Sequence, residues 1–172
     1  MAGSVITLVR PTADGSTLQW QLSTGATHYA LIDDVVTQPT SSGTADYIFA
    51  DLTNDDDIDE IVLSTTSIPK AVWRIDQVIV WYLINDAGGD GITFRSNIKI
   101  GGSWQTEKTF IPAGSGAFAW DSLTWTGSWT RDNFADFQVR CQAEASMTTS
   151  EEFQIAVLYA NIYGYSINQQ MV

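Results

Sequence analysis

The chain has 172 residues, the size of a single domain and long enough to bury a hydrophobic core. Hydrophobic residues make up 44% of it and aromatic residues 12%, so a disordered or low-complexity chain is excluded. One cysteine and one histidine exclude an intrachain disulfide and a zinc site built from several of these residues. Twenty acidic residues against eight basic ones give a net charge of −12. This charge repels phosphate backbones and anionic lipids, which predicts no nucleic-acid and no membrane partner.

The N-terminal third predicts short strands separated by turns. Residues 1–10 lack the basic start and long apolar stretch of a signal peptide, so no export signal is expected. Within them, the apolar run Val5–Val9 predicts either a first strand or an arm that reaches a neighbouring chain. Pro11–Gly15 has the composition of a turn. Residues 17–22 then alternate between polar and apolar, as in a strand with one solvated face. Weaker strands are predicted at 29–32, 46–52 and 60–63.

The middle of the chain contains Val72–Ile84, a run that is apolar on both faces. Its Val, Ile, Trp and Tyr content favours a central strand over a helix. Trp73 and Trp81 lie eight residues apart, on the same face as Ile75, and we expect both tryptophans to be in the core. On that basis Trp81→Ala would cost about 3–5 kcal/mol of stability.

The C-terminal half continues the same pattern. Residues 92–100 and 137–143 alternate cleanly, 104–111 is a weaker strand, and Phe153–Ile167 is apolar on both faces. A helix is the competing interpretation for Ser150–Tyr159, where two glutamates follow a serine that could cap it. Short strands with frequent Gly, Asn and Asp between them are typical of a two-sheet structure. We predict an all-β fold, a two-sheet antiparallel β-sandwich of jelly-roll type with about eight or more strands, in a single domain spanning residues 1–172.

The acidic run at residues 54–60 is the best metal candidate. Asp55, Asp57 and Asp59 have the one-three-five spacing of calcium ligands. The EF-hand pattern then fails, because Glu60 stands where a glycine is needed and Thr66 where a bidentate acid is needed. Two interpretations stay open: a calcium site of another type, or a solvated turn whose charges protect a sheet edge. No other cofactor is predicted.

Catalytic motifs are not found in the sequence. His28 has Asp33 nearby, but no Gly-x-Ser-x-Gly segment presents a serine nucleophile. A glycosidase needs two acids at a defined separation, and nothing in the sequence indicates that any two of Asp34, Glu107 and Glu144 lie together in this way. The sequence therefore predicts a protein that is not an enzyme.

Four tryptophans lie among Gly, Ser, Thr and Asp: Trp104, Trp120, Trp125 and Trp129. Rings flanked by short polar side chains serve as platforms for the apolar face of a sugar. They serve equally as anchors of a protein interface, or as plugs at the end of a sandwich. The sequence leaves these three roles open, and all four residues are candidate interface or glycan contacts.

The order of these features resembles a β-sandwich module of tailed-phage virion proteins. The resemblance rests on Arg10–Ser16, His28–Asp34, Ala45–Phe49, Ser128–Arg140 and Ile155–Tyr159. It implies a structural role in a virus particle, as capsid decoration, head fibre or tail module, made in the host cytoplasm and exposed on the virion surface. The implied partners are a major capsid protein or another virion protein and further copies of the chain, as a dimer or trimer. The alternative function is a carbohydrate-binding, receptor-binding module of an adsorption apparatus or of a secreted protein. The resemblance supplies no catalytic residues.

Overall fold

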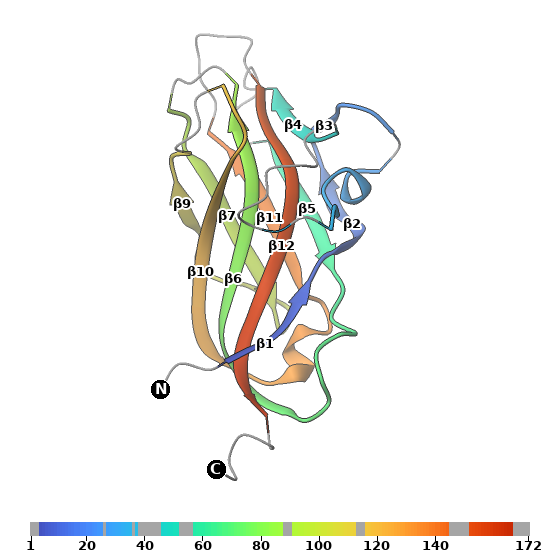
Figure 1. Cartoon of the computed structure of the whole chain (residues 1–172), viewed down its shortest axis with the longest axis vertical. Coiled ribbons are helices and arrows are strands. Elements are labelled where there is room, and N and C mark those ends of the chain that lie inside the picture. Colours follow the sequence, from blue (N-terminus) through green and yellow to red (C-terminus); the bar gives the residue numbers. More distant parts are fainter. Residues whose placement is uncertain are drawn as a thin grey trace.

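The computed structural model describes residues 4–25, 27–35, 37, 46–51, 57–87, 91–112, 116–144 and 152–166, and the strands within them form two sheets. Figure 1 shows β10, β6 and β12 side by side in front of β7, β11 and β5. Every strand pair is antiparallel. Sheet A contains, in spatial order, β10 (Ala119–Trp129), β6 (Val72–Asp86), β12 (Glu152–Ser166), β4 (Ile48–Asp51) and β3 (Gln21–Leu22), with β1 (Ser4–Val9) also paired to β12. Sheet B contains β2 (Pro11–Leu18), β5 (Ile58–Leu63), β11 (Gln138–Ala143), β7 (Phe94–Ile100) and β8 (Ser103–Trp104), with β9 (Lys108–Phe110) also paired to β7.

The topology is that of a jelly roll. The chain passes from one sheet to the other between β4 and β5, β5 and β6, and β6 and β7, and it alternates again from β10 through β11 to β12. The sheet order β4-β12-β6-β10 therefore faces β5-β11-β7-β8, the arrangement produced by two interlocked Greek keys. The predicted all-β, antiparallel, jelly-roll sandwich is confirmed.

The hydrophobic core fills the space between the sheets. Phe94 of β7 and Phe153 of β12 stack across it, with ring centroids 5.4 Å apart and planes 4° apart. Tyr82 of β6 is fully buried, and its hydroxyl donates to Ser96 Oγ at 2.8 Å. Burial raises the pKa of Tyr82 and that of the Cys141 thiol well above their ordinary values. Both groups are therefore neutral components of the core.

Most predicted strands are present, but several segments differ from prediction. The predicted strand 17–22 is divided between β2 and β3, which belong to different sheets, and the predicted strand 104–111 is divided between β8 and β9. Residues 11–15 belong to β2 and not to a turn; the missing N–H of Pro11 is tolerated because a proline fits the first position of a strand. Tyr29–Leu31 is a short 3₁₀ helix, η1, and not a strand. The eleven-residue β10 was not predicted, since its many Gly, Ser and Thr residues had the composition of loops. Residues 5–9 form part of a strand of sheet A, as the first of the two interpretations expected.

The prediction for the face of β6 was wrong. The inward residues are Val78, Val80 and Tyr82, whereas Trp81 is only partly buried on the opposite face, and Trp73 is 43% exposed. Both faces of this strand are apolar, so alternation alone could not indicate which face the core covers. A register shift around Asp76 also changes the pattern, because Gln77 pairs with Tyr163 while Ile75 pairs with the next residue of β12.

Gly164 allows β12 to pass very close to β6. A Cβ at this position would lie 2.2 Å from the carbonyl oxygen of Arg74 and 2.9 Å from Cα of Ile75. We expect Gly164→Ala to lower the free energy of unfolding by about 1–3 kcal/mol, because backbone atoms would have to move apart. Urea unfolding measures this, with Ser166→Ala on the same strand as the control. A Gly164→Ala protein as stable as the control would contradict the packing of β6 against β12.

The described residues contain no helix that is long and apolar enough to span a membrane.

Candidate functional site

The outer surface of sheet A, on the side opposite the core, carries a cluster of aromatic side chains. Trp81 of β6 lies across from Tyr159 of β12 in the strand register. On the other side of β6, Trp120 of β10 pairs with Leu83, two residues further along the same face. These side chains form a second hydrophobic cluster, separate from the core. We define the aromatic face by its five rings: Tyr47, Trp81, Phe118, Trp120 and Tyr159.

The rings of the aromatic face contact one another. Trp81 and Tyr159 are nearly parallel, with centroids 6.4 Å apart, and Trp120 meets Tyr159 edge to face at 5.6 Å. Tyr47 and Phe118 lie 6.1 Å apart. Tyr159 is buried beneath the cluster, whereas the other four rings are partly exposed. A ligand on this face would therefore contact partly exposed rings that neighbouring rings hold in place.

Polar groups border these rings on both sides. Ser122 and Thr124 of β10 lie on the same side of the sheet as Trp81 and Ile79, their partners in the register. Asn161 of β12 also pairs with Ile79. Hydroxyl and amide groups can donate and accept hydrogen bonds beside the apolar surface of the rings.

A charged group also lies over the ring of Tyr159. The guanidinium of Arg10 lies 5.4 Å from the centre of that ring, and it donates a hydrogen bond to the backbone carbonyl of Asp34. Burial lowers the pKa of Arg10. Burial and the neighbouring carboxylates of Asp46 and Asp33 raise the pKa of Asp34. The aromatic face thus adjoins acidic side chains with one arginine among them.

One polar atom in the aromatic face lacks a partner. The indole nitrogen of Trp81, Nε1, is buried and has no hydrogen-bond partner among the residues that the structure describes. A buried donor left in this state costs about 1–3 kcal/mol, and ordered water or a ligand oxygen normally satisfies it. The fold therefore leaves an unused donor beneath the surface where a polar ligand would bind.

The four tryptophans selected from the sequence are not brought together. Trp120 alone of these belongs to the aromatic face. Trp125 is a core residue with 3% exposure, and its Nε1 donates to the carbonyl of Thr106 at 2.9 Å, so its burial contradicts a contact role. Trp129 packs against Phe134 next to the core. Trp104 lies on the outer face of sheet B, where its ring stacks 4.1 Å from the guanidinium carbon of Arg140.

Sequence reasoning missed Tyr47, Phe118 and Tyr159, and it assigned Trp81 to the core. The sequence contains a partial indication of this cluster, since the two runs that are apolar on both faces predict a second apolar surface on the side of the sheet away from the core. What the sequence could not show is which side of β6 and β12 faces sheet B.

The calcium prediction is not supported at the residues that the structure describes. Asp55 lies outside them. Asp59 is fully buried in β5, and its carboxylate contacts His28 Nδ1 at 2.7 Å and the backbone N–H of Trp20 at 3.4 Å. This side chain points into the protein and is already engaged. The carbonyl of Asp57 accepts a hydrogen bond from Trp20 Nε1. Across the described ranges, no three His, Cys, Asp or Glu side chains gather closely enough to hold a metal ion.

His28 pairs with Asp59, and not with Asp33 as a triad would have required. The histidine is 8% exposed, so the pair is enclosed between η1 and β5. The pKa of Asp59 is raised to about 6: burial is the largest cause and Asp14 adds to the rise, while His28 and the Trp20 N–H oppose it. The pair joins the segment around residues 20–32 to sheet B.

Comparison with known proteins gives distant structural likenesses. No protein-family profile and no curated protein matches the chain. A carbohydrate-binding module from Cellvibrio mixtus lichenase 5A, solved with cellotriose, is 13% identical with a TM-score of 0.46, and the match covers 94% of this chain and 99% of that one. The xylan-binding CBM22-1 domain of Paenibacillus barcinonensis Xyn10C is 10% identical with a TM-score of 0.46, over 96% and 98% of the two chains. The Agl-KA catalytic domain matches at 14% identity and a TM-score of 0.44, over 95% of this chain but 28% of that chain. Likenesses at this level assign neither a family nor a ligand.

Proposed function

We propose that this protein binds a neutral glycan chain on the aromatic face of sheet A, and that it acts by binding and not by turnover. One observation carries the proposal: partly exposed Trp81 and Trp120 are held against Tyr159 on the outside of a sheet, with hydroxyl and amide groups beside them. A pyranose ring has an apolar face of C–H groups and a rim of hydroxyls. Aromatic rings complement the first, and short polar side chains complement the second.

The charge of the protein supports a neutral ligand. The net charge is −12, and Asp33, Asp34 and Asp46 lie close to one another near Arg10 at the border of the aromatic face. An anionic polysaccharide would be repelled by this field, whereas a neutral one would not. Carboxylates also accept hydrogen bonds from sugar hydroxyls.

Trp120→Ala is expected to weaken binding of the best neutral polysaccharide at least about tenfold, which corresponds to about 1.4 kcal/mol. Affinity electrophoresis against a panel of soluble β-glucans, xylans, mannans and galactans would select the ligand, and calorimetry would measure its affinity. Trp81→Phe keeps a ring but removes the unpartnered N–H, so it should lose less affinity than Trp120→Ala.

The matched control is Trp104→Ala, which removes a partly exposed tryptophan from the opposite sheet. It should leave binding unchanged, and circular dichroism should show that all three variants keep the wild-type fold. If no polysaccharide binds, or if Trp104→Ala weakens binding as much as Trp120→Ala, the aromatic face is not a glycan site. Its apolar rings would then fit a protein partner better.

The location on a virus particle stays a prediction from the resemblance of the sequence to phage modules. The same holds for self-association and for a capsid or tail partner. A glycan-binding face is compatible with this location, because surface sugars are among the groups that a virus particle can bind on a cell. Labelled antibody that decorates intact particles of a source virus would support it, and absence of the protein from purified particles would contradict it.

A further inference from the structure

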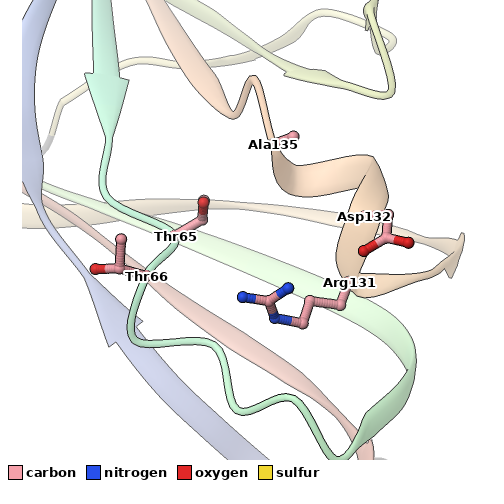
Figure 2. A pocket seen from close by; sticks show the side chains of 5 residues that line it. All are labelled: Thr65, Thr66, Arg131, Asp132 and Ala135. Carbon is pink, nitrogen blue, oxygen red and sulfur yellow. The ribbon is translucent and has the colours of Figure 1, made fainter.

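A pocket of about 350 Å³ lies at one end of the sandwich, away from the aromatic face and outside the function proposed above. Thr65 and Thr66 line it from the connection between β5 and β6. Arg131, Asp132 and Ala135 line it from η2 (Arg131–Phe134) and the residue after it. Figure 2 shows the guanidinium of Arg131 between the two threonines on one side and Asp132 on the other. The volume falls in the lower part of the roughly 300–1,000 Å³ range of small-ligand sites.

The walls of the pocket are held in place before any ligand arrives. Arg131 Nε donates to the carbonyl of Ile68 at 3.1 Å, which ties the guanidinium to the facing connection. Thr130 and Asn133 form a capping box at the start of η2, with Thr130 N donating to Asn133 Oδ1 at 2.8 Å. The fully buried Phe134 anchors η2 to the core. A site that is already formed loses little entropy on binding.

Several hydrogen-bonding groups of the pocket remain available. Among the described residues, no group hydrogen-bonds the two terminal nitrogens of Arg131 or the Thr65 hydroxyl. The Thr66 hydroxyl lies 2.9 Å from that of Ser64 and retains further bonding capacity. Asp132 is exposed and adds a carboxylate acceptor. Donors and acceptors therefore border one small space, and the methyl groups of Ala135 and the threonines supply apolar wall.

This combination favours hydroxyl groups over an anion. An anion would gain from Arg131 but would be repelled by Asp132 and by the net charge of −12. A hydroxyl group both donates and accepts, so two adjacent hydroxyls can receive a bond from Arg131 and give one to Asp132. We propose that this pocket binds a single neutral sugar unit through two adjacent hydroxyls, as a second site independent of the aromatic face.

Titration of ¹⁵N-labelled protein with D-mannose, D-galactose and D-glucose, followed by NMR, tests this directly. At least one of these sugars should shift the amide signals of residues 64–68 and 130–135 with millimolar affinity, and leave those of Trp81 and Trp120 in place. The corresponding neutral disaccharides would distinguish a free sugar from the end of a chain. Binding of the free sugar alone, or of both, supports the proposal.

Thr65→Val keeps the shape of the side chain and removes the unused hydroxyl, so it should fold normally and weaken binding several-fold. Arg131→Lys keeps the positive charge and loses the planar pair of donors, so it should lose more. Thr109→Val, an exposed threonine on β9, is the control and should bind as wild type does.

If sulfate or glucuronate shifts these amides and the neutral sugars do not, the pocket is an anion site and the proposal is wrong. It is equally wrong if no sugar causes shifts, or if the shifts persist unchanged in Arg131→Lys. Failure of the aromatic face would show separately in Trp120→Ala.

Discussion

Replacing Phe153 with alanine is expected to lower the free energy of unfolding by about 3–5 kcal/mol. Phe153 is fully buried in the central strand of sheet A. Its ring stacks on Phe94 from the opposite sheet, and it meets Trp20 edge to face at 6.2 Å. Alanine would leave a cavity between β12 and β7, because the rings of Phe94 and Trp20 are held by their own backbone segments and packing and do not fill the space. Chemical denaturation followed by tryptophan fluorescence gives the loss.

Phe110→Ala is the comparison for this variant. Phe110 is only partly buried on β9 at the edge of sheet B, where its ring lies 5.1 Å from that of Phe94, so a smaller loss is expected. Phe153→Leu, which keeps most of the volume, should also cost less than Phe153→Ala. Equal losses for Phe153→Ala and Phe110→Ala would show that Phe153 is not at the centre of the core.

Asp59→Asn is expected to remove a pH dependence of stability worth up to about 3 kcal/mol. Burial raises the pKa of Asp59 from 3.8 to about 6 in the folded protein. Between these values the folded state holds a proton that the unfolded state releases, so the contribution of Asp59 to stability is full below about pH 4 and is lost as the pH rises through about 6. Asparagine cannot ionise. The stability of Asp59→Asn relative to wild type should therefore rise between about pH 4 and pH 7.

Urea unfolding at several pH values measures this difference. Glu107→Gln, which changes an exposed acid, should show no comparable trend. The effect should persist in a His28→Gln background, because His28 lowers the pKa of Asp59 and does not raise it. A constant difference between Asp59→Asn and wild type across this range would mean that the carboxyl group is not buried as described.

The architecture was predictable where a strand has one solvated face. The alternation in residues 137–143 corresponds to β11, and that in 92–100 to β7, because one side of each strand faces the core and the other faces water. The same rule could not place β10, in which Leu123 and Trp125 are buried among small polar residues. It also could not distinguish the two apolar faces of β6.

The candidate site was less predictable than the fold. Trp120, Trp81 and Tyr159 are 39 to 78 residues apart in sequence, and only the register of β10, β6 and β12 brings them onto one surface. Of these, Trp120 could be selected from its polar neighbours in the sequence. His28 and Asp59 are likewise 31 residues apart, and their pairing depends on how η1 packs against β5. Local composition indicates which residues are unusual, but the connections between the sheets determine which of them meet.

The position of β12 has a consequence for how the chain reaches its native state. This strand lies between β6 on one side and β4 and β1 on the other. Its Leu158 pairs with Tyr82 of β6, and its Ala160 pairs with Val9 of β1. Until it is in place, the β10–β6 pair, the β4–β3 pair and the single strand β1 are not joined, and sheet A exists only as three pieces with open edges. The pairs it closes are distant in sequence, so a large loop entropy must be overcome before they contribute, and such topologies fold slowly. During synthesis on the ribosome, sheet A therefore forms as a continuous structure only after residues 152–166 have emerged.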